Sequence, residues 1–527
     1  MKYVSTRGAA AGSSFREALF SGYAVDGGLF MPEEVPRVSA DTLRQWRALS
    51  YPQLVQNICS LYISPDEIPV QELGALIERA LSRFAHSEVV TFKRLRDGLN
   101  VLELFHGPTM AFKDLAMCCL AQFILYFLQK EDKHVTIVVG TSGDTGGSAI
   151  ASLRGAKRAD VVVLLPAGRC SRVQELHMTT AMEENVHVFT VEGSSDDLDE
   201  PIRRLFADSE FSSRHGVISI NSINWGRVLV QVAHHFYAYF RCTDGGGGGG
   251  GAEVEEEEMP TVEVVVPTGA AGNAAVAREQ GHGGRAAGFA QRKSAGALGR
   301  DSSRTLPPGV TAGCVARRMG LPIRLLCAVN QNDVVHRALR SGDFSVDGAV
   351  KPSLASAIDI QVPYNMERVF HLCSDADTAL VRDVMTRFYE SGQANLPATL
   401  QTRTGSALRR PRPPSSRRWL SASAFASRST PRSQRCAASP SAASPCAAAT
   451  TGTRCSATQW HASPAGARRP PPKRNVDART TARTTARTAA RTTARTTARS
   501  ARKLRLATYG AEEVFSMHTC TAVISVC

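Results

Sequence analysis

Short apolar runs alternate with helical patterns along most of the chain between residues 97 and 400. Buried strands are predicted by the runs HVTIVVG, ADVVVLLPAG, NVHVFTVEG and TVEVVVPTG, and helical segments separate them. One segment, DLAMCCLAQFILYFLQK, carries apolar residues on nearly every helical face and is therefore expected to be buried on all sides. Buried strands separated by helices favour parallel sheets covered by helices on both faces, an α/β fold.

The pattern divides the chain into three parts. Residues 1–95 mix turn signals with helical patterns and predict a small, mostly helical N-terminal domain. Residues 96–400 are expected to form the α/β region, with flexible insertions near 244–260 and at 274–309, which are rich in Gly, Glu, Ala or Arg. Residues 401–527 contain ARTTARTT repeats with almost no large apolar residue, so this tail is predicted to be disordered.

Charge is distributed unevenly along the chain. Residues 401–527 hold 23 of the 62 Lys and Arg residues but only 3 of the 48 Asp and Glu residues, which leaves 39 basic and 45 acidic residues in the rest. The folded part is therefore mildly acidic, and a nucleic-acid interface is not indicated for it. Spaced arginines in the tail can attract phosphates non-specifically, although a solvated tail without a partner is the favoured interpretation.

Other compositional features bear on the cellular location of the protein. No run of about 18 apolar residues is present, so we expect no membrane span. The start, MKYVSTRGAA, lacks the apolar stretch of a secretory signal. The 13 cysteines are scattered without metal-like spacing, which favours free thiols in a reducing, cytoplasmic compartment and no metal site. The oligomeric state is left open.

The stretch FHGPTMAFKD, residues 105–114, places Lys113 at the start of a predicted helix among apolar neighbours. Burial favours the neutral amine, and a neutral amine can form an imine with a carbonyl compound. The alternative is a lysine whose alkyl stem lies along apolar surface while its ammonium reaches water. Taken alone, the local pattern favours this second interpretation.

Two glycine-rich loops each follow a predicted buried strand: GTSGDTGGSA, which starts at Gly140, and PTGAAGN, which starts at Pro267. Backbone N–H groups in such loops can bind a carboxylate or a phosphate. An ordinary strand–helix connection is the alternative, and neither loop is a Walker A or GxGxxG motif. Two anion-binding loops and one inward lysine together favour pyridoxal 5'-phosphate, which needs an imine to lysine, a phosphate site and a place for an amino-acid carboxylate.

Eight motifs, in order, resemble the threonine synthase family and most closely its vertebrate threonine synthase-like 2 group. These are YVSTRG (3–8), DGGLFMPE (26–33), FHGPTMAFKD (105–114), TSGDTGGSA (141–149), LLPAGRCSRVQELHMTT (164–180), NSINWGR (221–227), VPTGAAGN (266–273) and DIQVPYNMER (359–368). The resemblance covers residues 1–400 outside the two insertions. It implies a fold-type II pyridoxal-phosphate enzyme, similar to the tryptophan synthase β subunit.

The resemblance also implies roles for individual residues. Lys113 would bind the cofactor as an imine and later move protons between substrate carbons. Ser142, Gly143, Asp144 and Thr145 would receive the substrate carboxylate or lie beside the cofactor ring. The cofactor phosphate would be bound by Gly269, Ala270, Ala271, Gly272 and Asn273. The candidates for the phosphate of a small phosphorylated amino-acid substrate are Asn221, Ser222, Asn224 and Arg227, whose alternative interpretation is a polar strand end followed by a helix.

The activity implied by the resemblance is a phospho-lyase reaction on O-phosphohomoserine and O-phosphothreonine that gives 2-oxobutyrate, ammonia and phosphate. The alternatives are threonine synthesis from O-phosphohomoserine, or an inactive family member with a basic tail. Two departures from the family bear on this choice. Residues 274–309 separate the phosphate loop from the helix TAGCVARRMG, and residues 401–527 have no counterpart of the family's last strands and helices, which is expected to leave a sheet edge bare.

Overall fold

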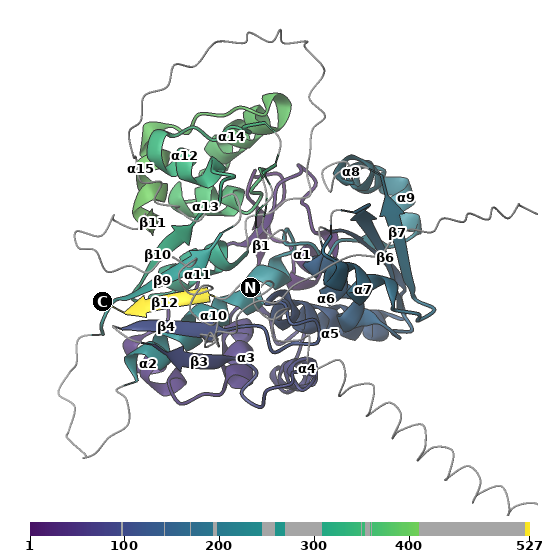
Figure 1. Ribbon diagram of the computed structural model, residues 1–527, viewed down its shortest axis with the longest axis horizontal. Coiled ribbons are helices and arrows are strands. Elements are labelled where there is room, and N and C mark those ends of the chain that lie inside the picture. Colours follow the sequence, from purple (N-terminus) through teal and green to yellow (C-terminus); the bar gives the residue numbers. More distant parts are fainter. Residues whose placement is uncertain are drawn as a thin grey trace, which may run out of the picture. The chain divides into compact units, whose positions relative to one another are not determined.

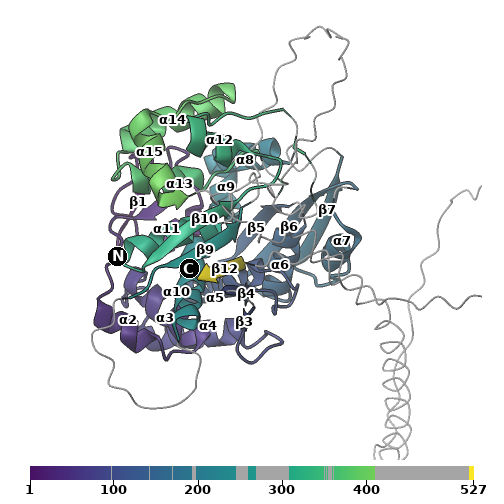
Figure 2. The ribbon, with the colours of Figure 1, turned by 60° about the vertical axis from the view of Figure 1, so that its left-hand side comes forward.

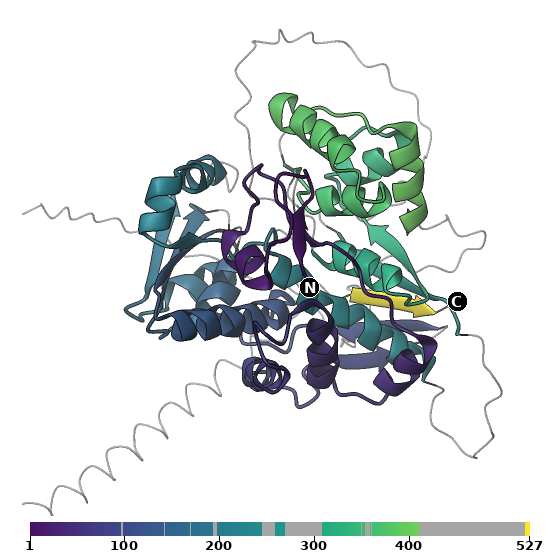
Figure 3. The same cartoon turned by 180° about the vertical axis from the view of Figure 1, so that it is seen from behind.

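The structure is a computed structural model that describes residues 1–95, 98–141, 143–168, 170–192, 198–244, 259–268, 308–348, 350–351, 353, 359, 361–409 and 522–526. Its N-terminal part holds a two-stranded antiparallel sheet and four helices: β1 (Tyr3–Ser5), β2 (Phe30–Pro32), α1 (Phe15–Ser21), α2 (Ala40–Trp46), α3 (Tyr51–Tyr62) and α4 (Val70–Leu81). The first three helices begin at serine N-caps, whose hydroxyls accept a backbone N–H of the first turn. Their buried faces belong to the same hydrophobic core as the α/β region, and Figure 3 shows this purple N-terminal segment from behind, against the rest of the described core.

Three of the predicted apolar runs form a four-stranded parallel sheet, together with a two-residue strand that the sequence analysis did not predict. Its order is β7-β6-β5-β8, with β5 (Val135–Gly140), β6 (Ala159–Pro166), β7 (Val186–Val191) and β8 (Val217–Ile218). The helices that alternate with these strands are α6 (Asp144–Leu153), α7 (Arg172–Thr179), α8 (Asp199–Ala207) and α9 (Ser209–Arg214). The carboxyl ends of β5 and β8 lie next to each other, because the two strands pair in parallel.

A second, six-stranded sheet is only partly parallel. Its order is β11-β10-β9-β12-β4-β3, with β3 (Thr91–Arg94), β4 (Leu99–Glu103), β9 (Val262–Pro267), β10 (Ile323–Ala328), β11 (Leu408–Arg409) and β12 (Ala522–Val526). Strands β9, β10 and β11 pair in parallel, whereas β12 pairs antiparallel with both β4 and β9, and β3 with β4. The yellow strand β12 lies between β9 and β4 in Figure 1.

The described part of the tail differs from the predicted disorder. Helix α15 (Ala398–Ala407) crosses the expected boundary at residue 400, and β11 and β12 both belong to the second sheet. The physical reason for β12 is local, because AVISV is a short run of apolar and β-branched residues in an otherwise polar tail. Residues 410–521, which hold the repeats, lie outside the described residues.

Two long helices fill the core between the sheets. Helix α5 (Lys113–Glu131) is buried on nearly every face, as predicted, and packs against α4, α6 and α10. Helix α10 (Trp225–Thr243) packs against α3, α5 and α11 (Pro308–Arg318), and Figure 2 shows α10 and α11 beside β9 and β10. His235 Nε2 donates to Gly309 O at 2.8 Å and so attaches the start of α11 to α10. The predicted insertions 244–260 and 274–309 lie almost entirely outside the described residues.

The remaining helices gather near the β11 edge of the second sheet (Figure 1): α12 (Val334–Ser341), α13 (Met366–Cys373), α14 (Thr378–Ser391) and α15. An ion pair between buried Glu367 and mostly buried Arg7 joins α13 to the N-terminal segment. Glu367 accepts from Arg7 Nε at 2.9 Å, from Arg7 Nη2 at 2.8 Å and from Thr6 Oγ1 at 2.5 Å. This bidentate pair fixes the first residues of the chain against a helix that follows them by about 360 positions.

Within the described ranges, no helix combines the length and apolar content that crossing a membrane requires. The same residues include no group of three or more His, Cys, Asp or Glu side chains that could hold a metal ion. The cysteines in these ranges are free thiols, most of them buried.

Replacing Glu367 by Ala should lower the free energy of unfolding by about 3–5 kcal/mol, because it leaves the Arg7 guanidinium buried without its counter-charge. The matched control is Asp383→Ala, which removes an exposed ion pair with Arg387 on α14 and should cost less than about 1 kcal/mol. Urea denaturation followed by circular dichroism measures both. Equal losses in the two variants would contradict the structural role given to Glu367.

Stability should also fall as the pH drops below about 6.5, because His371 is buried and burial lowers its pKa to about 4. The unfolded chain binds a proton at this position between pH 6.5 and 4, whereas the folded chain does not, so acid favours unfolding in that window. His371→Leu should therefore reduce the loss of stability between pH 7 and pH 5 by about 2 kcal/mol. The exposed His187 is the control, and His187→Leu should leave the pH dependence of thermal unfolding unchanged.

Candidate active site

The buried amine of Lys113 lies at the N-terminal end of α5. The residue is 8% exposed, and its Nζ forms an ion pair with Asp144 Oδ2 at a distance of 3.1 Å. Asp144 is the first residue of α6, so its carboxylate also lies at the positive end of that helix. The amine is therefore buried, although the local sequence pattern alone favours an ammonium that reaches water, and its carboxylate partner comes from the first glycine-rich loop.

The residue after Lys113 holds the turn that precedes α5. Asp114 is fully buried and accepts from Thr109 Oγ1 at 2.7 Å, from Thr109 N at 2.8 Å and from Ser148 Oγ at 2.6 Å. Burial raises the pKa of the Asp114 carboxyl, and the bonds from Ser148 and Thr109 act in the opposite direction. Because these bonds join the turn, α5 and α6, they set where the backbone of Lys113 begins its helix.

The loop after β5 is shaped by its own side chains. Thr141 Oγ1 accepts from the N–H groups of Gly143 and Gly146, both at 2.9 Å, and so caps the start of α6. Gly143 has φ +137°, a conformation that favours glycine. Asp144 Oδ1 accepts from Gln174 Nε2 at 2.7 Å, so the carboxylate is held from two sides, by α5 and by α7.

The loop at 219–224 lies beside this first loop. Asn221 Nδ2 donates to Gly140 O, the last residue of β5, at 3.5 Å. Asn224 is fully buried and caps α10: its Nδ2 donates to Leu19 O and Ser219 O, and its Oδ1 accepts from Gly226 N. The two loops therefore meet at the carboxyl edge of the parallel sheet, where α/β proteins bind their ligands.

Arg227 is 1% exposed and forms no ion pair with a carboxylate among the residues that the structure describes. Its Nη1 donates to Ile220 O at 3.5 Å, and its Nε has no hydrogen-bond partner in the same ranges. Burial lowers the pKa of Arg227 to about 10. One turn further along α10, the fully buried amide of Gln231 also lacks a described partner at both of its polar atoms.

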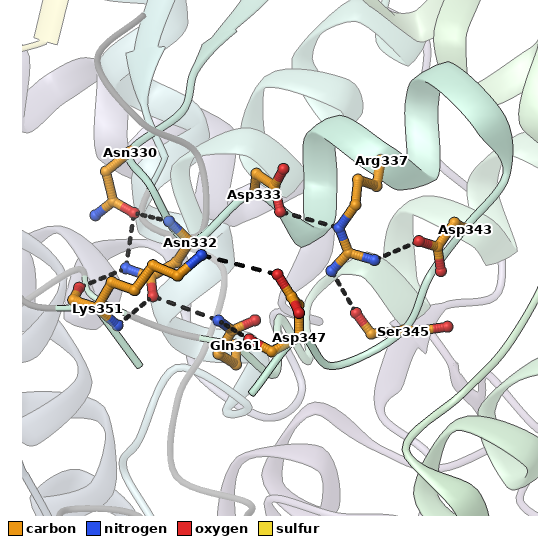
Figure 4. A network of polar contacts seen from close by, with 9 residues as sticks. All are labelled: Asn330, Asn332, Asp333, Arg337, Asp343, Ser345, Asp347, Lys351 and Gln361. Atoms are coloured by element: carbon orange, nitrogen blue, oxygen red, sulfur yellow. Dashed lines mark hydrogen bonds and ion pairs between the residues drawn. The ribbon is translucent and has the colours of Figure 1, made fainter. Parts of the chain in front are cut away.

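A polar network follows the end of β10, at the carboxyl edge of the second sheet (Figure 4). Asn332 is fully buried; its Nδ2 donates to Asn330 Oδ1 and Lys351 O, and its Oδ1 accepts from Lys351 N. On the other side of Figure 4, Arg337 pairs with Asp333 and Asp343 and donates to Ser345 O. The network attaches the segment after α12 to the end of β10.

Comparisons with known proteins show which family the chain resembles. A family model for the threonine synthase N terminus matches residues 2–81. The chain is 52% identical over 408 residues to threonine synthase-like 2 from Homo sapiens, which covers 77% of this chain and 75% of the human protein. It is 36% identical to threonine synthase from Schizosaccharomyces pombe, over 70% of this chain and 66% of the yeast protein.

The chain belongs to the threonine synthase family.

Solved threonine synthases share its fold. A pyridoxal-phosphate-bound threonine synthase from Brucella melitensis matches with a TM-score of 0.64 and 33% identity, over 77% of each chain. The structure of threonine synthase from yeast matches with a TM-score of 0.62 and 32% identity, over 78% of this chain and 75% of that one. The predicted fold-type II α/β architecture is therefore confirmed.

The structure brings together most of the candidate residues that it describes. Lys113, Gly143, Asp144 and Thr145 share one end of β5, and the loop with Asn221 and Ser222 lies against it, followed by Arg227 in the first turn of α10. Both polar atoms of the Asn224 side chain are bonded to backbone groups: Oδ1 caps α10, and Nδ2 donates to Leu19 O and Ser219 O. This favours the alternative interpretation of a strand end followed by a helix for this residue. Outside the described residues lie Ser142, Gly269, Ala270, Ala271, Gly272 and Asn273.

Several residues that shape this site were not predicted from the sequence. They are Thr109, Asp114, Thr141 and Gln174. The pattern Ser-x-x-Gln at 171–174 is a capping box and signals the start of α7. It does not reveal that Gln174 also reaches Asp144, 30 positions away.

Gly143→Ala should destabilise the protein and displace Gln174, because a Cβ at Gly143 would come within 2.4 Å of the Gln174 side chain. The control Gly155→Ala has φ +76° and meets no atom within 4 Å, so it isolates the cost of the backbone conformation. We expect about 1 kcal/mol for Gly155→Ala and at least twice that for Gly143→Ala in chemical denaturation. Equal losses would mean that the loop shifts freely and that the Asp144–Gln174 contact does not constrain it.

Proposed function

We propose that this chain is a pyridoxal-phosphate-dependent phospho-lyase that acts on O-phosphohomoserine and O-phosphothreonine. Each turnover consumes one water molecule and releases 2-oxobutyrate, ammonia and phosphate. The observation that carries the proposal is the buried amine of Lys113, held 3.1 Å from Asp144 at the carboxyl edge of the parallel sheet. The Brucella relative with the same fold is described as pyridoxal-phosphate-bound, which supports the same cofactor here.

The described residues fit this cofactor and a phosphorylated substrate. A buried primary amine can attach the aldehyde of the cofactor. Arg227 is a buried guanidinium without a described counter-charge, and an anionic phosphate group would lower the cost of burying it. We assign the substrate phosphate to Arg227, Asn221 and Ser222. The substrate carboxylate is assigned to residues 142–145, and the cofactor phosphate to residues 269–273.

Lys113 and its neighbours supply the proton chemistry in this proposal. When bound, pyridoxal phosphate supplies an electron sink for the negative charge at the substrate α-carbon. The Lys113 amine takes the α-proton and carries protons between the α-, β- and γ-carbons. Asp144 holds Nζ near the start of α6, and Gln174 keeps that carboxylate oriented. Arg227 binds the phosphate that leaves from the γ-carbon of O-phosphohomoserine and stabilises its charge.

The early steps are common to the lyase and to threonine synthase, so the products separate the two. Addition of water at the β-carbon would give threonine, whereas hydrolysis after elimination gives 2-oxobutyrate and ammonia. The similarity to threonine synthase-like 2 favours the lyase, because that group is more similar to this chain than the threonine synthases are. We also propose a cytoplasmic location, which the free thiols of the described cysteines support.

Purified full-length chain incubated with pyridoxal phosphate should gain a visible absorbance band that borohydride removes, and it should release 2-oxobutyrate and phosphate from O-phosphohomoserine. Lys113→Ala should abolish the band and lower kcat/KM by at least about 10³-fold, since it removes both the attachment point and the proton carrier. Lys130→Ala, an exposed lysine in the last turn of the same helix, should change neither.

Three outcomes would count against the proposal. A chain that gains no band with added cofactor is not a pyridoxal phosphate enzyme. A band that persists in Lys113→Ala means that another group attaches the cofactor. Threonine as the main product, with little 2-oxobutyrate, would make the protein a synthase rather than a lyase.

A further inference from the structure

Arg368, on α13, is a fully buried arginine without a carboxylate partner among the described residues. Its Nε donates to Phe30 O at 3.0 Å, its Nη1 donates to Asn365 Oδ1 at 2.6 Å, and its Nη2 donates to Ile223 O. Glu367, the nearest acidic residue in sequence, is engaged instead by Arg7 and Thr6. Three neutral oxygens, from three different parts of the chain, therefore accept from one guanidinium.

Burying an arginine without an ionic partner lowers the stability of the folded chain. Burial lowers the pKa of Arg368 to about 9, opposed by the neighbouring charge of Glu367. A buried charge without an ionic partner is usually less stable than a well-packed apolar side chain of similar size. What the guanidinium adds is geometry, because its planar fork can hold several oxygens in fixed directions at once.

Asn365, at the N-terminal end of α13, bonds the residue before Ile223 in the 219–224 loop. Its Nδ2 donates to Ser222 O at 3.2 Å, while its Oδ1 accepts from Arg368. Its backbone oxygen also accepts from Thr311 Oγ1, in the first turns of α11, at 3.3 Å. We call Asn365 and Arg368 the α13 brace, since together they hold two successive carbonyls, those of Ser222 and Ile223.

The loop that the brace holds has further contacts at its two ends: Asn224 Nδ2 donates to Leu19 O and Ser219 O, and Asn221 Nδ2 donates to Gly140 O. Strand β8, which leads into it, is only two residues long, so sheet pairing ends at Ile218. On the opposite side of the loop, Arg227 contacts Ile220 O at a longer 3.5 Å. Within the loop, the α13 brace fixes the carbonyls of Ser222 and Ile223, and so it constrains the backbone that carries the Asn221 and Ser222 side chains.

We propose that Asn365 and Arg368 are positioning residues that hold the 219–224 loop in the conformation that binds the substrate phosphate. This inference rests on the proposed function for its choice of ligand. Neither residue is required to touch the substrate, because both act through the backbone carbonyls of Ser222 and Ile223. The same helix turn carries Glu367, so the loop is also tied to the N-terminal segment through Thr6, Arg7 and Phe30.

The test compares full-length Arg368→Met, Arg368→Lys and Asn365→Ala with a control, Arg16→Met. Arg16 forms a bidentate pair with Glu131, at the end of α5 opposite to Lys113 and about 27 Å from it along the helix. The first readout is hydrogen exchange of the 219–225 amides, which requires no activity. Arg368→Met and Asn365→Ala should speed this exchange about ten-fold or more, and Arg16→Met should leave it unchanged.

The second readout is kinetic. Arg368→Met should raise KM for O-phosphohomoserine and the inhibition constant of inorganic phosphate about ten-fold each, with a smaller fall in kcat. Arg368→Lys should fall between wild type and Arg368→Met, because an ammonium keeps the charge but cannot reach three acceptors in fixed directions. If Arg368 had a purely structural role, all Arg368 variants would have a lower melting temperature, but KM and the inhibition constant of inorganic phosphate would stay unchanged.

The outcomes are distinguishable. Unchanged exchange at 219–225 in both Arg368→Met and Asn365→Ala overturns the brace, and so does faster exchange with unchanged KM and phosphate inhibition. If the wild-type chain turns over no phosphorylated substrate, the proposed function fails, and hydrogen exchange with and without inorganic phosphate still tests the brace. If Arg368→Met does not fold, Asn365→Ala and Arg368→Lys give the same two readouts.

Discussion

The carboxylate of Asp144 accepts from two donors that belong to different helices, Lys113 Nζ of α5 and Gln174 Nε2 of α7. A lysine side chain has four rotatable bonds and loses considerable entropy when it is fixed, so a buried amine needs such a partner to occupy one position. The partner is itself fixed, because Thr141 caps α6 and Gly143 permits the turn that brings Asp144 to the helix start. The geometry of the candidate active site depends on this short chain of contacts.

Positive charge is the second organising feature. Lys113, Arg227 and Arg368 are all buried, but their partners differ: the first has a carboxylate, whereas the two arginines contact neutral oxygens among the described residues. A site that binds a phosphorylated amino acid must accommodate more negative charge than the cofactor-binding amine can balance. In the proposed function, the guanidinium of Arg227, which has no ion pair among the described residues, balances this charge, and in the proposed brace Arg368 holds the loop that carries the other binding groups.

The sequence was informative where a property is local. Strands β5, β6, β7 and β9 and helix α5 were predictable because burial leaves a continuous apolar run, and Lys113 stands out at the boundary of one such run. The contacts that complete the site were not predictable, since Gln174 meets Asp144 across 30 positions and Arg368 meets Ile223 across 145. Strand β12 was missed for another reason: its five residues are outweighed by the composition of the long tail before them.

The segment between β9 and α11 is attached at both of its described ends. Thr268 N donates to Ala328 O at 3.0 Å and its hydroxyl to Val266 O, while Gly309 O accepts from His235. Because neither attachment involves the residues in between, and because closing a longer loop costs only slightly more entropy, α11 can keep its position whatever the distance along the chain. Beyond residues 269–273, which are assigned to the cofactor phosphate, the chain before α11 is therefore a position at which an engineer could insert a reporter domain.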